Sequence, residues 1–174
     1  ILHQHLYDFT YRLPYALKIL YNDTEYTLIN LHYKCCGDGV LQEEDYWDEE
    51  YMRLRCSNHL DQYISNNLSN DKVILLGDFN DLLIDSYNVF ETFLNEPDEY
   101  YFVDYYIAED PSMIPYWSYP SWPSHIDHIL ITNEIFNTEY DAITVRVDEI
   151  FFNSFNNYDN LMSDHRPVGI RISN

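Results

Sequence analysis

The sequence is short of positive charge, and this shortage limits what the protein can bind. Its 174 residues include 9 lysines and arginines against 30 aspartates and glutamates, a formal net charge of −21. A field of this sign repels polyanions at long range, which argues against avid, nonspecific binding of duplex nucleic acid. It does not exclude an enzyme that meets a phosphoester locally, with metal ions neutralising the pocket.

Cysteines and long apolar runs are also scarce. Cys35, Cys36 and Cys56 lack the CxxC or Cys/His spacing of a zinc site. One of the adjacent pair could bridge to Cys56 or to another segment in an oxidising compartment, or the thiols could be free and buried. No run approaches the ~20 apolar residues that a membrane span needs, so we expect no transmembrane segment.

The length predicts one domain, residues 1–174, with enough chain for a core. The apolar fraction of 46% is normal for a globular protein, and 18 tyrosines supply most of the high aromatic fraction of 17%. The chain opens on Ile1 and not on Met, and its first residues read as mid-sequence. We therefore expect an upstream part to precede it, with any targeting signal.

Apolar patterns predict a mixed α/β protein. Strands are expected at 11–20, 26–33, 72–78, 126–132, 142–147 and 166–172. A helix is expected at about 47–68, because apolar residues recur there at steps of four. A short helical piece is expected near 88–95, whereas 105–124 and the Asn-rich 153–160 should be irregular. In such a layered protein, polar residues at strand ends line a common edge.

Two short strings set polar side chains beside apolar strands. In GDFN, Asp78 and Asn80 follow a strand; in SDHRP, Asp164 and His165 precede one. Hard cations such as Mg²⁺ and Ca²⁺ prefer oxygen ligands, and phosphoester hydrolysis needs a cation, a proton shuttle and an amide donor close together. The two strings could supply all three, although Asp and Asn also cap many ordinary turns.

Two further strands end or begin with histidines. His32 ends the strand at 26–33 and could act as a general acid, although a histidine at a strand end is often structural. In HIDH, Asp127 shares a strand face with His125, and its carboxylate could orient a histidine ring. We expect His128, on the other face, to be a packed or exposed strand histidine.

From about residue 11 to the C-terminus, four strings in this order and spacing resemble the endonuclease/exonuclease/phosphatase superfamily, the deoxyribonuclease-like metal-dependent phosphoesterases. These strings are Asn30-Leu31-His32, Gly77-Asp78-Phe79-Asn80, His125-Ile126-Asp127-His128 and Ser163-Asp164-His165-Arg166-Pro167-Val168. The third departs from the family, because His125 and His128 stand where Arg and Tyr are common.

The resemblance implies a four-layer α/β/β/α sandwich, of class α/β (α+β), with its N-terminal part missing. It also implies attack of water on a phosphodiester or phosphomonoester, assisted by Mg²⁺ or by Mn²⁺ or Ca²⁺. His32 would assist the leaving group. The whole would act as a hydrolase such as a nuclease, a phosphatase or a small-molecule or lipid phosphodiesterase.

The other matched residues take roles from the same resemblance. His165 would be the base or the phosphate-contacting residue, and Asp127 would hold its ring. Asp164 would be a metal ligand. Asp78 would orient or activate the water or the metal, and Asn80 would donate to the phosphoryl oxygen beside the metal. These roles suit in-line attack with the developing charge neutralised.

The family's first half carries an Asn and a metal-binding Glu, and no segment here matches them. The chain is therefore interpreted as a C-terminal portion that exposes a sheet face and edges, and we expect it to be poorly stable and catalytically weak. The alternative is a non-catalytic binding or scaffold module that keeps the fold.

The loop at 116–123 is rich in Tyr, Trp and Pro and would overhang the site. It could form an aromatic wall for a base, sugar or lipid headgroup, or a self-packed cap. Together with the CCGDG segment at 35–39, it is similar to a secreted bacterial branch of the superfamily. We expect a secreted, bacterial monomer, and the charge favours small, single-stranded or membrane-derived phosphoesters over long duplex DNA.

Overall fold

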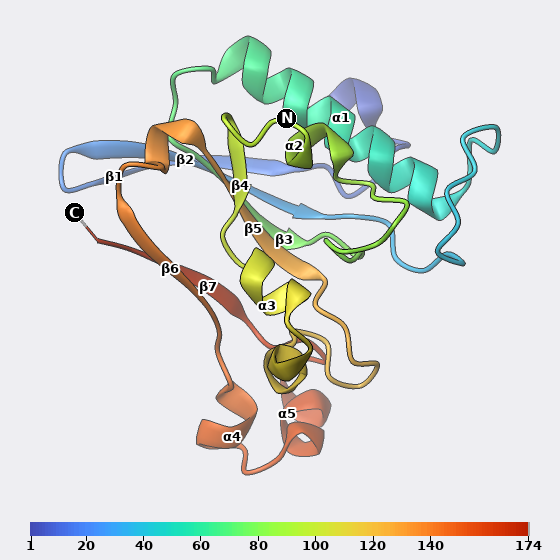
Figure 1. Cartoon of the computed structure of the whole chain (residues 1–174), viewed down its shortest axis with the longest axis vertical. Helices are drawn as coiled ribbons and strands as arrows, with labels where there is room; N and C mark the ends of the chain where they lie inside the picture. Colours follow the sequence, from blue (N-terminus) through green and yellow to red (C-terminus); the bar gives the residue numbers. More distant parts are fainter. Residues whose placement is uncertain (174) are drawn as a thin grey trace.

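The computed structural model describes residues 1–173 and contains two β-sheets (Figure 1). The larger sheet has the order β1-β2-β3-β5-β4, in which β2 and β3 are parallel and the other neighbours antiparallel. Its strands are β1 (Tyr15–Tyr21), β2 (Thr24–His32), β3 (Val73–Asp78), β4 (Tyr100–Phe102) and β5 (Asp127–Thr132). The smaller sheet pairs β6 (Glu139–Thr144) with β7 (Val168–Ser173), antiparallel.

Helices lie on one face of the large sheet and at one end of the small one. The α-helices are α1 (Glu49–Asn67), α2 (Glu91–Leu94), α3 (Tyr105–Glu109), α4 (Val147–Phe151) and α5 (Phe155–Leu161). Short 3-10 helices cover His3–His5, Pro111–Tyr116 and Asn133–Ile135. The helix α1 begins where Asp48 caps it, because the Asp48 side chain accepts a hydrogen bond from the Tyr51 amide. Figure 1 shows α1 across the large sheet and α4 and α5 beyond the end of the β6–β7 pair.

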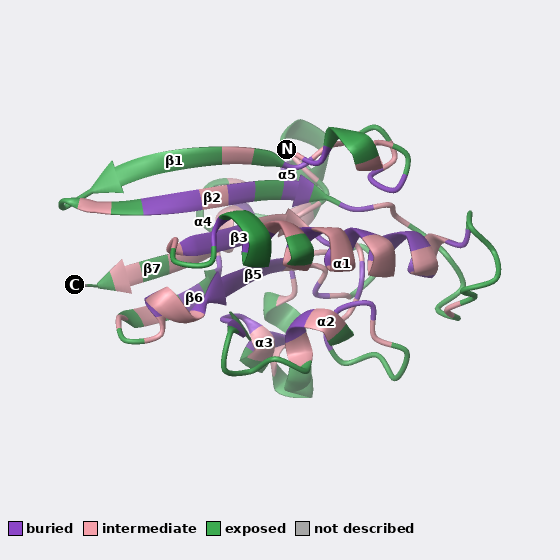
Figure 2. Cartoon of the chain, turned by 90° about the horizontal axis from the view of Figure 1, so that it is seen from above, coloured by how far each residue is buried: buried purple, intermediate pink, exposed green. Residues whose placement is uncertain are grey.

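The alternation of the central strands creates a core on each face of the large sheet. Ile29 and Leu75 face α1, whereas their neighbours Leu28 and Ile74 face β6 and β7. Figure 2 shows this burial along β2, β3 and β5, next to an exposed β1. Within residues 1–173 the layers are thus helix, large sheet and small sheet.

The expected strands and helices are largely present, with several corrections. The strand expected at 142–147 is β6 at Glu139–Thr144, and β4 and α4 were not expected. The first strand begins at Tyr15 and not at residue 11, because Thr10 and Tyr11 have positive φ angles and Pro14 offers no amide hydrogen. The expected loop at 153–160 contains α5, whose start Ser154 caps by accepting from the Asn157 amide. The region 105–124 holds α3 and a 3-10 helix, so it is only partly irregular.

All three cysteines are free, with Cys56 buried and Cys36 exposed, so the expected alternative of a bridge to Cys56 is not formed. Over residues 1–173, no helix combines the length and the apolar character needed to cross a membrane.

Candidate functional site

The residues predicted from the four strings meet around one cleft of about 680 Å³ at the ends of the central strands. Its lining includes His32, Asp78, Asn80, Asp127, Asp164 and His165, together with Cys35, Cys36, Tyr119, Trp122, Ser124 and Ile126. The strand order explains the meeting. The neighbouring strands β2, β3 and β5 end or begin at this edge, and the turn before β7 brings in the last string.

Register places two carboxylates side by side. Asp78 ends β3 opposite Asp127, which begins β5. Asn80 has a left-handed φ of 53°, which turns the chain so that its amide donates to Asp78 Oδ1 (2.9 Å). The GDFN string therefore folds back on its own aspartate.

His165 is held by Asp127, as the resemblance implied. Its Nδ1 lies 2.7 Å from Asp127 Oδ2, and because a carboxylate only accepts, this ring nitrogen donates. Burial alone would lower the pKa of His165, but the hydrogen bond to Asp127 and the charges of Asp78 and Asp164 outweigh it and raise the pKa. Tyr119 lies against the ring, with centroids 4.8 Å apart. The ring is thus fixed in direction, and its charged form is favoured more than in a free histidine.

His32 has a partner that the sequence analysis missed. His32 Nε2 lies 2.6 Å from Arg12 Nη1 and 3.4 Å from Asp78 Oδ2. Because an arginine only donates and its contact is the shorter one, Nε2 accepts and the ring proton sits on Nδ1. Burial, then the charges of Arg12 and His165, lower the pKa of His32. His32 is therefore a neutral histidine whose available proton is at Nδ1. Arg12 precedes any expected site string, and only the fold brings it here.

Asn80 differs from its expected donor role. Its side-chain amide donates to Asp78 Oδ2 (2.8 Å) and to the Tyr33 carbonyl (3.2 Å), so both of its protons are engaged. The group left free is the carbonyl oxygen, which can only accept. In this arrangement Asn80 suits a cation better than a phosphoryl oxygen.

The cleft has an excess of negative charge that a cation would relieve. Asp78, Asp127 and His165 each offer a ligand atom, and these atoms lie within 4.8 Å of one another. Burial, followed by repulsion from Asp127, raises the pKa of Asp78 to about 6. Asp164 adds an exposed carboxylate at the rim. Oxygen ligands of this kind fit a divalent hard cation. Among residues 1–173, no glutamate lines the cleft.

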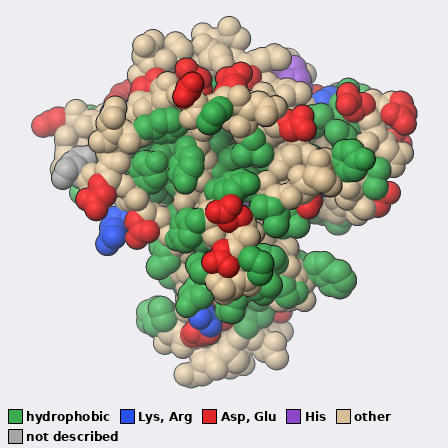
Figure 3. Space-filling view, in the orientation of Figure 1, with side chains coloured by type: hydrophobic (Ala, Val, Ile, Leu, Met, Phe, Trp, Pro, Cys, Tyr) green, Lys and Arg blue, Asp and Glu red, His purple; other side chains and the backbone are tan. Residues whose placement is uncertain are grey.

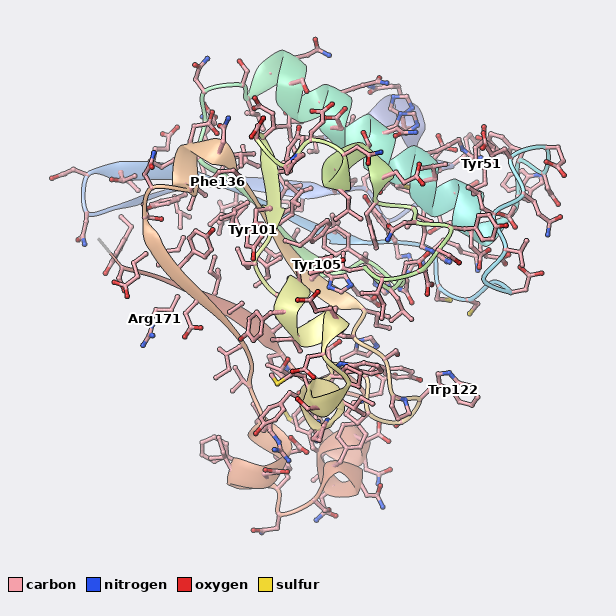
Figure 4. All side chains as sticks on the ribbon, viewed as in Figure 1. Tyr51, Tyr101, Tyr105, Trp122, Phe136 and Arg171 are labelled. Atoms are coloured by element: carbon pink, nitrogen blue, oxygen red, sulfur yellow. The ribbon has the colours of Figure 1, made fainter. Side chains whose placement is uncertain are left out.

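The expected alternatives for the loop at 116–123 are each met in part. Trp117 packs as part of a cap, since its ring N–H donates to the Ile107 carbonyl. Tyr119 and Trp122 line the cleft, and Figure 4 shows the Trp122 side chain projecting away from the ribbon. Tyr119 thus lies beside His165, and Trp122 is an exposed aromatic group lining the same cleft.

A fully buried polar network supports the cleft from behind. Asp104 Oδ2 receives hydrogen bonds from His128 Nδ1 (2.7 Å) and His125 Nε2 (3.0 Å). His128 Nε2 donates to the Asp81 carbonyl (3.0 Å), so both nitrogens of this ring donate and the ring is an imidazolium. Although burial opposes it, the charge of Asp104 raises the pKa of His128. His128 is therefore packed, as expected, and structural.

The network continues to the strand that carries Asp127. His125 Nδ1 accepts from the Ser118 amide (3.3 Å), so His125 is neutral. Ser118 Oγ in turn accepts from the amides of Ile126 and Asp127. The prediction that His125 shares a strand face with Asp127 is wrong, because His125 lies before β5 and bonds to Asp104 on the same side as His128. Ser118 links His125 to the backbone of Asp127.

A second buried pair anchors the SDHRP turn. Arg166 makes a two-pronged ion pair with Asp148 (3.0 and 2.7 Å), and its amide donates to the Ser118 carbonyl (2.7 Å). Tyr158 donates to the His165 carbonyl (3.0 Å). The sequence string contained Arg166, but its partner lies in the separate helix α4.

No family model matches the sequence, and no curated protein does. Solved structures do match. TDP2 from D. rerio, complexed with a single-strand DNA product, has a TM-score of 0.58 and 13% identity over 90% of this chain and 59% of that one. The human nocturnin catalytic domain with a bound sulfate anion has a TM-score of 0.58 and 16% identity over 93% of this chain and 53% of that one.

Beta toxin from Staphylococcus aureus has a TM-score of 0.57 and 14% identity over 93% of this chain and 57% of that one. The chain thus spans 53–59% of the length of these three proteins. At such identities the likeness is one of fold.

Proposed function

The chain has the deoxyribonuclease-like fold of the endonuclease/exonuclease/phosphatase superfamily, as its four strings predicted, and on that premise we propose that its cleft hydrolyses phosphoesters with a divalent cation. The observation that carries the proposal is the Asp127–His165 pair beside Asp78 and Asn80. An oriented imidazole next to an unneutralised oxygen cluster is what attack of water on a phosphoester needs.

The hydrogen bond to Asp127 and the raised pKa of His165 support one of its two expected roles. With Nδ1 donating to Asp127, the other ring nitrogen of the charged form donates, and a phosphoryl oxygen is its natural acceptor. Of the two roles expected for His165, base or phosphate contact, we therefore propose phosphate contact. Asp127 fixes the ring and balances its charge.

Asp78 is the candidate for activating the attacking water. Burial and the charge of Asp127 raise its pKa to about 6 without a cation. A cation held by the same carboxylate would lower that pKa, so Asp78 is proposed to act on the water together with the cation. His32, neutral and protonated at Nδ1, can give that proton to a leaving oxygen while Arg12 stays on Nε2. His32 and Asp78 thus stand on adjacent parallel strands.

The cation is proposed to be Mg²⁺, with Mn²⁺ or Ca²⁺ as substitutes. Asp78, Asp164 and the free carbonyl oxygen of Asn80 would hold it. When bound, it would neutralise charge that develops on the phosphoryl group. Because no glutamate lines the cleft in the described residues, we expect weak hydrolysis from this chain alone.

The substrate class follows from charge and from the aromatic residues that line the cleft. A net charge of −21 disfavours long duplex DNA, whereas Tyr119 and Trp122 can stack on a base or sugar. We propose small, single-stranded or membrane-derived phosphoesters. The same charge is tolerated in salty, extracellular surroundings, and we propose a secreted bacterial monomer.

The decisive experiment is His165→Ala, assayed on a panel of phosphodiesters and phosphomonoesters with Mg²⁺ and after chelation. Loss of the charged donor should lower the rate by about 10³-fold, and chelation should abolish it. His3→Ala, an exposed histidine outside the cleft, is the control and should keep the rate.

A binding or scaffold module is the second candidate, favoured by the missing glutamate. It would be supported if the parent hydrolysed nothing on the panel, or if His165→Ala and His3→Ala were equally active.

A further inference from the structure

The loop before α1 carries a second acidic cluster outside the proposed catalytic groups. Asp38, Asp48 and Glu50 each offer a carboxylate oxygen, and these oxygens lie within 4.8 Å of one another. Two oxygens on one Ca²⁺, each at about 2.4 Å, can be at most ~4.8 Å apart, and these three oxygens meet that condition. Figure 1 shows this loop curving out beyond the first turn of α1, and Figure 4 places Tyr51 in that turn.

Glu50 gives the cluster its significance. The residue is 4% exposed, yet its Oε2 has no hydrogen-bond partner. A buried carboxylate oxygen that loses its hydration and gains no partner is destabilising unless a cation or a donor approaches it. Glu50 therefore points to a ligand that protein groups do not replace.

The neighbouring protein groups leave Glu50 short of positive charge. Arg53 lies 3.3 Å from Glu50 Oε1, but it also makes a closer ion pair with Asp81 (2.7 Å). Burial first, and then the charge of Asp81, raise the pKa of Asp85 in the same region, which shows the local excess of carboxylates. The Arg53 guanidinium is thus shared between Glu50 and Asp81.

The loop backbone fits tightly around the carboxylate. Gly39 donates its amide to Glu50 Oε1 (2.7 Å). A Cβ on Gly37 would lie 2.2 Å from Glu50 Oε1 and 2.5 Å from Oε2, so only glycine allows this approach. Asp48 uses Oδ1 for the amides of Gln42 and Tyr51, which fixes the direction of its carboxylate. In Figure 3 acidic side chains stand around this end of the molecule.

We propose that Asp38, Asp48 and Glu50 form a structural Ca²⁺ site. All donors are carboxylate oxygens, from a glycine-bearing loop and from the start of α1, and their irregular arrangement suits the variable geometry of Ca²⁺ better than the strict octahedron of Mg²⁺. The site is distinct from the catalytic cluster and does not depend on it.

The bound ion would stiffen one wall of the cleft. Arg53 donates to the carbonyls of Lys34 and Cys36, and Cys35 and Cys36 line the cleft. Fixing Glu50 beside Arg53 therefore fixes the segment that faces the substrate.

The test is a calorimetric Ca²⁺ titration of the chelator-treated full chain carrying Asp78→Asn, which removes a ligand of the cleft. We expect one Ca²⁺ per chain, and affinity at least about tenfold weaker after Glu50→Gln or Asp38→Asn. Asp38 is exposed, so Asp38→Asn remains informative if Glu50→Gln fails to fold. Glu43→Gln, an exposed acid of the same loop, should bind as the parent does.

Hydrogen exchange gives an independent readout, since Ca²⁺ should slow exchange of the amides at 37–42 in the parent and not in Asp38→Asn. No Ca²⁺ binding, or equal affinity in Glu43→Gln and both site variants, would overturn the proposal. Neither result depends on hydrolysis, so a failure here leaves the proposed function standing, and an inactive cleft leaves the Ca²⁺ site standing.

Discussion

The two faces of the five-stranded sheet are covered to different degrees. Under α1, Leu60, Leu75 and Leu130 are completely buried. Under β6 and β7, residues such as Leu28 and Ile172 stay half-buried around an apolar hollow of about 230 Å³. Figure 3 shows hydrophobic side chains gathered in the middle of the face that it presents.

The difference between the two faces explains how β5 contributes both to the core and to the cleft. In β5, His128 points to the α1 side, where the rings of Phe79, Phe90 and Phe102 lie 5.7–5.9 Å from its own. The preceding Asp127 points to the other side and into the cleft. The tightly packed face therefore holds the buried pair of His128 and Asp104, and the looser face presents the Asp127 carboxylate to the cleft.

The largest change in stability should come from Asp104→Asn, on the tightly packed face. Asp104 accepts from His125, His128 and the Ile129 amide, so the change leaves a buried imidazolium without its counter-ion. We expect a loss of about 3–5 kcal/mol in the free energy of unfolding, measured by urea denaturation. Asp98→Asn, at an exposed aspartate, should change it by less than about 0.5 kcal/mol. Similar values for both would mean that the pair is not buried as described.

A pair of truncations compares the faces directly. Leu60→Ala, on the α1 side, should cost about 2–5 kcal/mol, because it opens a cavity in a fully buried cluster. Ile172→Ala, at a half-buried position of β7, should cost about 1 kcal/mol, since less area leaves water there. Both follow from urea midpoints, and equal losses would show that the two faces are packed alike.

The smallest change in stability is expected from a change of pH. The raised pKa of His128 means that its stabilisation is complete below pH 6.5 and is lost as pH rises through the folded-state pKa. Although burial opposes it, His128 and His125 lower the pKa of Asp104, so its stabilisation is present above pH 3.8 and is lost as pH falls below that value. The urea midpoint of unfolding should therefore decline towards high pH and towards low pH. A midpoint that rose steadily with pH would contradict the assigned charges.

Much of the fold and of the cleft could be predicted locally. GDFN and SDHRP are runs whose polar residues must lie at strand ends, because the apolar residues beside them need burial. The α5 helix was missed, since its cap by Ser154 outweighs a composition typical of loops. The start of β1 was missed because positive φ angles at Thr10 and Tyr11 leave no trace in the hydrophobic pattern.

The sequence by itself determined which polar residues stand at the strand ends, because its strings place them next to apolar runs. Only the tertiary structure decided which groups act on one another. Arg12 meets His32 and Asp104 meets His128 across 20 and 24 residues of chain, and no local spacing encodes either contact. The physical reason is that a side chain's charge state depends on burial and on partners in space, and both exist only once the sheet has formed.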